Sequence, residues 1–215
     1  MATTAAAQEP DCPVIGYEAS YNTLGESRAN LAISTLYKHT WVEIIYLADE
    51  VDMENDGCRI TSIAFNVRSV GTPTEAQTTT VYLGLSDKMR FGYNIDFVNP
   101  AGGAMQVVYA GTWTLHEGWN VFEFDSPFVY TDITKNLIIG VLCEYTNTTQ
   151  WGWSSEQIYY TSSPNRILQA YSDEIVPDPT NMGAYRGNLR VGYMRPDIKI
   201  CSNCCNLEAT IEFGP

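Results

Sequence analysis

Positive charge is scarce in this chain. Its 215 residues include 12 lysines and arginines against 25 aspartates and glutamates, which gives a formal net charge of −13 at pH 7. Nucleic acids and anionic membranes bind proteins through basic patches. The composition therefore argues against nucleic acid and anionic membrane as partners.

Long apolar runs are missing as well. No stretch reaches the roughly 20 apolar residues of a membrane-spanning helix, so we expect no membrane insertion. The first ten residues contain no basic segment followed by an apolar core, so no signal peptide is predicted there. The acidic composition, rich in tyrosine, threonine and tryptophan, favours an excised extracellular or cell-surface module over a cytosolic protein.

Recognisable catalytic motifs are also absent from the sequence. The two histidines, His39 and His116, are isolated and too few for a three-histidine metal site. No Gly-x-Ser-x-Gly elbow marks a nucleophilic serine. Paired carboxylates can hydrolyse glycosides, but acidic residues spread over loops are more often simply solvated. We therefore expect a protein that is not an enzyme, with a glycan-active hydrolase as the less favoured alternative.

The sequence does contain a strong β-strand signal. Threonine, valine and the aromatic residues, among them 14 tyrosines and five tryptophans, fit a pleated sheet. Short strand-like segments recur at a spacing of about ten residues between turns rich in Gly, Pro and Asn, which is typical of a sandwich or barrel. The predicted strands are 41–47, 59–67, 79–85, 107–115, 120–125, 136–145, 166–171, 189–193 and 198–200.

These segments predict an all-β fold, a single jelly-roll-like antiparallel β-sandwich over residues 12–200. We expect residues 1–11 to be a flexible leader and residues 201–215 to be a Cys-rich tail or the start of a following domain. The strand at 136–145 is apolar on both faces, so we place it centrally in a covered sheet. The stretch 86–103 is predicted to be an ordered loop with aromatic anchors.

Alternation within two strands predicts which side chains share a face. Ile63 and Phe65 should lie on one face of their strand. In the strand at 107–115, Val107 and Tyr109 should face one way and Val108 the other.

Several short motifs follow one another in a set order between about residues 40 and 200. They are Glu43–Leu47, Ile60–Phe65, Val81–Gly84, Val108–Thr112, Glu117–Asn120, Ser126–Tyr130, Asn136–Val141 and Arg195–Ile198. In this order they resemble a β-sandwich module repeated in large secreted bacterial surface proteins, beside adhesin, fibronectin-III-like and hydrolase domains. The resemblance implies a jelly-roll sandwich without its own catalysis that serves adhesion, carbohydrate binding or spacing.

Aromatic residues are the leading candidates for ligand binding. Sugar rings present apolar C–H faces that stack on the rings of tryptophan and tyrosine. Trp151 and Trp153 are two positions apart, so a strand would place both indoles on one side, next to Tyr145, and Tyr93 is a further candidate. The alternative is that both indoles pack into the core or cover its end.

The densest acidic run, Asp49–Asp56, is the candidate cation site. Calcium binds six to eight oxygen ligands, and Asp52 and Asp56 are the candidate ligands here. The run lacks the residue order of an EF-hand, so a solvated loop is favoured. We expect no cofactor, with Ca²⁺ as the only candidate.

The six cysteines admit more than one use. Cys201, Cys204 and Cys205 cluster in the tail, but a zinc site usually needs two short pairs of ligands, and Cys12 and Cys58 would have to be recruited one by one. We favour disulfides or free thiols in the tail. In an oxidising compartment these cysteines could link chains to each other.

Two further features of the sequence are Cys143 and the residues near its C-terminal end. Cys143 lies in an apolar run and is predicted to be a buried thiol. Residues 207–213 alternate in polarity and could complete the sheet edge of a neighbour, which would allow self-assembly through the tail.

We therefore predict a non-catalytic extracellular module of a bacterial surface or secreted protein, which serves adhesion by binding a glycan. The alternative is a structural subunit or spacer that contacts protein partners by edge-strand pairing. The expected partner is a glycan or a surface protein.

Overall fold

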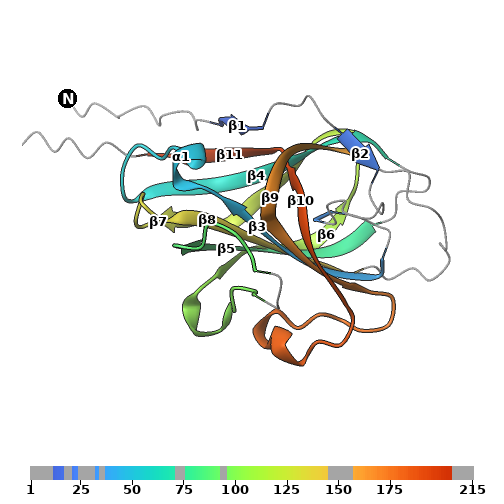
Figure 1. The fold of residues 1–215 in the computed structure, drawn as a ribbon. Helices are drawn as coiled ribbons and strands as arrows, with labels where there is room; N and C mark the ends of the chain where they lie inside the picture. The colour runs from blue at the N-terminus through green and yellow to red at the C-terminus, as the bar shows by residue number, and fades with distance from the viewer. Residues whose placement is uncertain are drawn as a thin grey trace, which may run out of the picture.

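The computed structural model describes residues 12–16, 21–23, 32–33, 37–70, 76–92, 96–144 and 157–204. These residues form an all-β antiparallel sandwich, as the sequence predicts (Figure 1). The strands are β1 (Val14–Ile15), β2 (Tyr21–Thr23), β3 (His39–Tyr46), β4 (Cys58–Ser69), β5 (Ala76–Ser86), β6 (Gln106–Thr114), β7 (Gly118–Tyr130), β8 (Asn136–Glu144), β9 (Gln157–Ser172), β10 (Asn188–Pro196) and β11 (Ile198–Asn203). Three short helical segments join them, α1 (Ala48–Val51), η1 (Ala101–Gly103) and η2 (Pro179–Ala184).

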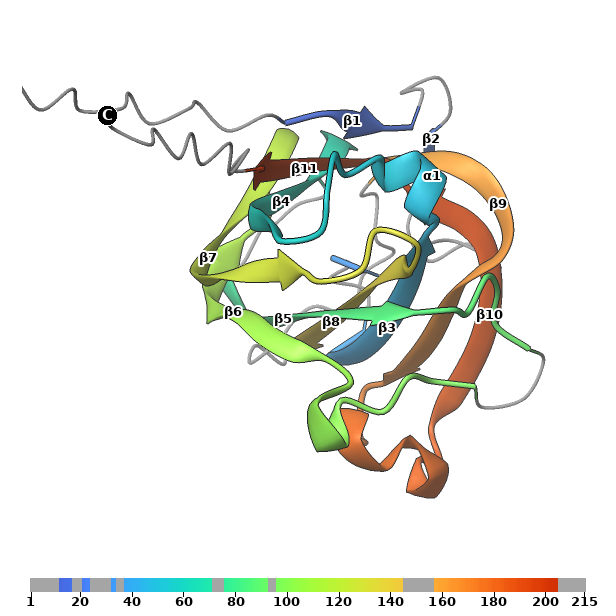
Figure 2. The same cartoon turned by 90° about the vertical axis from the view of Figure 1, so that its left-hand side faces the viewer.

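The strands form two layers joined by β9. One layer has the order β1-β11-β4-β7, and the other has the order β10-β9-β3-β8-β5-β6 (Figure 2). Residues 157–158 of β9 pair with β4 of the first layer and residues 157–159 pair with β2, whereas residues 167–172 pair with β3 of the second layer. The strand bends between these halves, where Pro164 has no N–H to donate to a ladder and Asn165 has a left-handed φ of 60°. The two layers thus form one continuous curled sheet.

The main core lies between the two layers. Val42 and Ile44 of β3 pack there with Ile63 and Phe65 of β4, and all four side chains are 0% exposed. Ile63 and Phe65 share the inner face, as their alternation predicts. Cys143 is a buried thiol in the same core, also as predicted.

The outer face of β3 and β8, the central strands of the second layer, is buried as well. Every residue from Thr40 to Tyr46 of β3 is buried, and so are both faces of β8 from Asn136 to Val141. The prediction of a covered central strand at 136–145 is therefore confirmed. Gly140 of β8 makes this packing possible, because a Cβ there would lie 2.3 Å from the Trp41 ring.

Strand β6 departs from the alternation that its sequence predicts. A β-bulge interrupts its pairing with β5, since Val81 pairs with Tyr109 while Tyr82 pairs with Val107. The extra residue, Val108, turns into the core at 1% exposure, and Val107 turns outward at 48% exposure. The prediction that Val107 shares a face with Tyr109 is therefore wrong, because a bulge inserts one residue and reverses the phase of the strand.

Both ends of the described chain are fastened to one edge of the first layer. Strand β1 pairs with β11, which pairs in turn with β4. Disulfides join Cys12 to Cys201 and Cys58 to Cys204. Strand β11 runs to Asn203, past the boundary expected at residue 200, whereas the proposed leader and the tail from Cys205 onward lie outside the described residues.

These disulfides correct one hypothesis about the tail. Cys201 and Cys204 are bonded within the chain, so they are not available to link chains or to hold zinc.

We predict that Gly140→Ala destabilises the fold by about 1–3 kcal/mol, because the added methyl group would overpack the contact between β8 and Trp41. Urea unfolding measures this change. Gly183→Ala is the matched control, since a Cβ at Gly183 meets nothing within 4 Å. Equal stability of the two variants would contradict the tight packing of this face.

Candidate functional site

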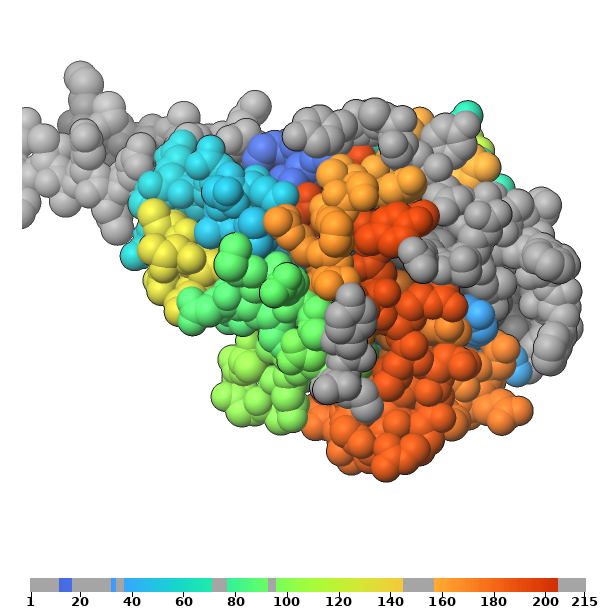
Figure 3. Space-filling view, in the orientation of Figure 1, coloured from blue at the N-terminus to red at the C-terminus, as the bar shows by residue number. Residues whose placement is uncertain are grey.

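Two long connections cover the outer face of β3, β8 and β5. The first connection follows β5 and spans residues 87–105, and the second joins β9 to β10 and spans residues 173–187. Both project from the same side of the sandwich and lie side by side (Figures 1 and 3). We call them the first and second cover loops.

Aromatic and sulfur-containing side chains hold the cover loops on the sheet. Phe91 and Met105 of the first cover loop pack on Ile45 and Ile138. Phe91 is 1% exposed, which confirms that the loop uses an aromatic anchor, as predicted. Tyr93, the residue of this loop that is a candidate for ligand binding, lies outside the described residues.

The second cover loop packs on the neighbouring part of the same face. Its Met182 and Tyr185 contact Trp41 and Ala170. Tyr82 of β5 meets the Trp41 ring edge-on, with the ring centroids 5.2 Å apart. The two loops therefore share one continuous apolar floor, which fixes their positions relative to each other.

A buried carboxyl group joins the first cover loop to the sheet. Glu43 is 0% exposed, and its two oxygens accept hydrogen bonds from the Val98 amide at 2.7 Å and from Trp41 Nε1 at 3.3 Å. Burial raises the pKa of Glu43 to about 8, although both hydrogen bonds and the charge of Lys88 act to lower it. Glu43 is therefore mainly protonated at neutral pH, so it anchors the loop without a buried charge.

Polar contacts within the first cover loop hold its shape. Lys88 forms an ion pair with Asp96 at 2.7 Å, and the second oxygen of Asp96 accepts from the Gly92 amide at 3.0 Å. The Phe91 amide donates to the carbonyl of Asn165 at the bend of β9, at 2.7 Å. The bend of β9 thus presents an acceptor to this loop.

The second cover loop has its own capping interaction. Oδ1 of Asp178 accepts from the amide and the hydroxyl of Thr180, at 2.9 and 2.7 Å, where η2 begins. Asn99 Nδ2 of the first loop donates to the Thr180 carbonyl at 3.1 Å. Asn99 therefore links the two cover loops directly.

A hollow of about 280 Å³ lies where the loops meet, and we call it the two-loop hollow. The half-buried ring of Phe97 lines it together with the exposed side chains of Asn99, Thr180 and Asn181. Its remaining lining residues are Pro179, Met182 and Gly183. This combination of a ring with amide and hydroxyl groups can hold a small molecule that has both an apolar face and hydroxyl groups.

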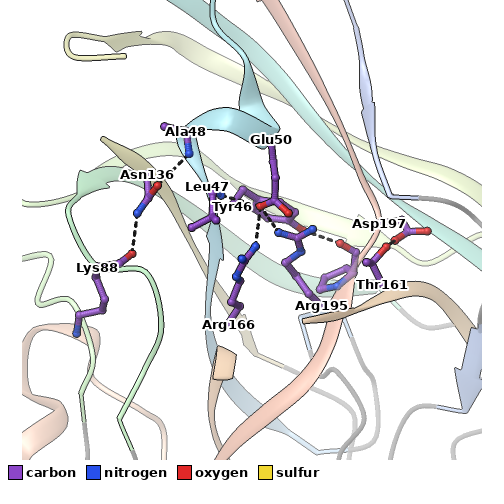
Figure 4. A network of polar contacts seen from close by, with 11 residues as sticks. Tyr46, Leu47, Ala48, Glu50, Lys88, Asn136, Thr161, Arg166, Arg195 and Asp197 are labelled. Atoms are coloured by element: carbon purple, nitrogen blue, oxygen red, sulfur yellow. Dashed lines mark hydrogen bonds and ion pairs between the residues drawn. The ribbon is translucent and has the colours of Figure 1, made fainter. Parts of the chain in front are cut away.

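A second polar cluster fastens α1 to the strands (Figure 4). Oε2 of Glu50 accepts from Arg195 at 2.6 Å, from Arg166 at 2.8 Å and from the Leu47 amide at 2.8 Å. Burial acts to raise the pKa of Glu50, but these hydrogen bonds and the two positive charges outweigh it and lower the pKa. Arg195, whose side chain is 2% exposed, also stacks on the ring of Tyr46. This cluster is built to hold elements together.

Some residues of the acidic run that was predicted to bind calcium have structural contacts instead. Glu50 faces two arginines, Asp52 ends α1 with a left-handed φ of 49°, and Asp56 accepts from the Ile133 amide at 2.7 Å. Asp52 and Asp56 are both exposed. Within the described ranges, no group of three or more His, Cys, Asp or Glu residues is placed to hold a metal ion. Calcium at Asp52 and Asp56 stays a prediction.

The predicted aromatic platform lies outside the described residues. Trp151, Trp153 and Tyr145 all belong to the segment 145–156, and Tyr93 belongs to 93–95. The sequence-based predictions do not include the residues that the structure brings together in the hollow. A signal existed for Glu43, the single acid in an aromatic and aliphatic strand, but none identified Asn99 or Thr180.

No protein family model matches this chain, and no curated protein matches it. Among solved structures, it is similar to the crystal structure of the cysteine protease and lectin-like domains of Cwp84, a surface layer associated protein of Clostridium difficile. The match has 15% sequence identity and a TM-score of 0.41, and it covers 78% of this chain and 33% of that chain. The match thus spans about a third of the length of that protein.

We predict that Glu43→Gln removes a pH dependence of stability. The folded pKa of about 8 lies above the ordinary value of 4.5, so the folded state keeps a proton that the unfolded state releases. The free energy of unfolding of the wild type should therefore fall as pH rises from about 4.5 to 8, and that of Glu43→Gln should fall less. Urea titrations at pH 5, 6.5 and 8 measure both slopes.

The exposed Glu117 supplies the control for this experiment. Glu117→Gln should keep the wild-type slope. A Glu43→Gln variant with the same slope as the wild type would show that Glu43 does not bury a proton.

Proposed function

We propose that this protein is an extracellular module that binds carbohydrate, and that the two-loop hollow is the binding site. The observation that carries the proposal is the lining of the hollow, where the Phe97 ring stands beside the amide groups of Asn99 and Asn181 and the hydroxyl of Thr180.

Sugar chemistry matches this lining. One face of a sugar ring is apolar and can lie against Phe97, as in other aromatic contacts. Its hydroxyl groups both donate and accept hydrogen bonds, and so does a carboxamide such as that of Asn181. The volume of about 280 Å³ lies just below the range of about 300–1,000 Å³ of small-molecule sites, which suits one sugar unit at a chain end or branch.

Pre-organisation of the hollow supports binding as well. Glu43, Phe91 and Tyr185 hold the cover loops on the sheet, and Asn99 joins them. A site whose walls are already ordered loses less conformational entropy when a ligand binds.

The disulfides support an extracellular setting. Two bonds, Cys12–Cys201 and Cys58–Cys204, persist in oxidising compartments and are rare in the cytosol. No helix among the described residues is long and apolar enough to cross a membrane. A bacterial surface or secreted protein, with adhesion as the purpose of glycan binding, is the setting that the sequence resemblance favours.

The proposal includes no catalysis. A general acid that acts near neutral pH needs a raised pKa and access to its substrate. Glu50 has a lowered pKa under two arginines, and Glu43 is fully buried beneath the first cover loop. Neither carboxyl group therefore combines the two requirements.

We predict saturable binding to at least one member of a panel of plant and host polysaccharides, measured by calorimetry at neutral pH. Phe97→Ala and Asn181→Ala should each weaken that binding by about tenfold, the loss expected for one aromatic or hydrogen-bonding contact. Asn188→Ala, which changes an exposed asparagine on β10 outside the hollow, is the matched control and should bind as the wild type does.

The predicted aromatic platform supplies a second comparison. A Trp151→Ala/Trp153→Ala variant should keep its affinity if the hollow is the site. If that variant alone loses binding, the ligand occupies the tryptophans and the hollow is not the site. A flat response across the whole panel would overturn carbohydrate binding itself.

A further inference from the structure

The disulfides connect the two ends of the described fold by a very short covalent path. Cys12 is bonded to Cys201, which is 189 positions away in sequence. Three residues beyond Cys201, the chain reaches Cys204, where the described residues end. A path along covalent bonds from Cys12 to Cys204 therefore crosses one disulfide and three peptide bonds. Residues 13–200 form a closed loop that lies outside this path.

This path matters because the backbone pairing at the same place is weak under tension. Strand β1 pairs with β11 at two positions, Val14 with Lys199 and Ile15 with Ile198, and the Ile200 amide donates to the Pro13 carbonyl beside them at 3.2 Å. The strands are antiparallel, so β1 begins at Val14 beside Lys199 and runs away from the end of β11 (Figure 2). A pull on both ends would load these pairs one after another, like a zip, rather than all together. The Cys12–Cys201 bond lies ahead of the first pair and takes the load instead.

The second disulfide limits how much of the chain tension can extend. Cys58 begins β4, and its bond to Cys204 closes a loop of 146 positions at the same edge. If the Cys12–Cys201 bond is missing, tension passes from Cys12 along the chain to Cys58 and then across to Cys204. Only residues 13–57, which include β1, β2 and β3, would then be loaded, and the chain from Cys58 to Cys204 would stay a closed covalent loop.

We propose that the protein acts as a force-bearing link, in which tension between its two ends runs through the disulfides and bypasses the sheets and the two-loop hollow. The layout serves a protein that is pulled through its two ends, because the sheets and the hollow then lie outside the path of the load. This function rests on the disulfide connectivity alone and stands whether or not the hollow binds carbohydrate.

Single-molecule force spectroscopy tests the proposal, with the full chain held by handles at its two ends. The oxidised wild type should show no unfolding step before the tether fails. A dithiol reductant, which becomes a cyclic disulfide as each protein disulfide becomes two thiols, should introduce an extension of about 65 nm, from 189 positions at roughly 3.5 Å each.

Two matched double variants distinguish the roles of the two bonds. Cys58→Ser/Cys204→Ser keeps the Cys12–Cys201 path and should still show no step. Cys12→Ser/Cys201→Ser loads residues up to Cys58, 58 − 12 = 46 positions, and should extend by about 16 nm. Urea unfolding verifies that both variants fold, so that a missing step is not mistaken for an unfolded chain.

The extension steps of the wild type and the two double variants decide the proposal. A step of about 65 nm in the oxidised wild type would overturn the proposal, and so would equal steps in the two double variants. No step in the wild type, none in Cys58→Ser/Cys204→Ser and the short step in Cys12→Ser/Cys201→Ser would establish it.

Discussion

The two apolar faces of β3 and β8 are the constraint on which the rest of the structure depends. A strand that is apolar on one face needs one partner layer, but these strands need cover on both sides. The first layer covers the inner face, and the two cover loops take the outer face, with Phe91 and Met182 as anchors. The hollow is a consequence of this arrangement, because two loops that share one floor leave a gap where their polar tips meet.

The buried or partly buried carboxyl groups of Glu43 and Glu50 join structural elements to one another. Glu43 links the sheet to the first cover loop and is held protonated by its burial. Glu50 is ionised and lies against Arg195 and Arg166, so that α1 is fixed to β9 and β10. The disulfides likewise join distant segments at the edge of the first layer, where they fasten β1 and the end of β11. Each of these interactions joins segments that are far apart in sequence. Together they hold the strands, α1 and the first cover loop in place around the hollow.

The local pattern of apolar and polar residues predicts the class of fold and the strands. It does not predict contacts between residues that are far apart in the sequence. The covered strand at 136–145 and the aromatic anchoring of the loop at 86–103 can be predicted because periodicity and apolar content are local. The reversal at Val108 was not, because a bulge depends on the partner strand. Glu43 meets a loop 55 positions away and Asn99 one 81 positions away, so neither contact has a local signature. Cysteine spacing likewise does not pair Cys12 with Cys201.

Hydrogen exchange of individual amides tests most directly whether the cover loops are part of the fold. The Val98 amide donates to Glu43 and the Phe91 amide donates to Asn165, although both lie in a segment without strand structure. If the loops are fixed by the need to cover β3 and β8, both amides should exchange slowly near pH 6, as we expect for the amides of β8. Exchange at the rate of an open loop, while β8 stays protected, would contradict the account and remove the basis for a preformed hollow.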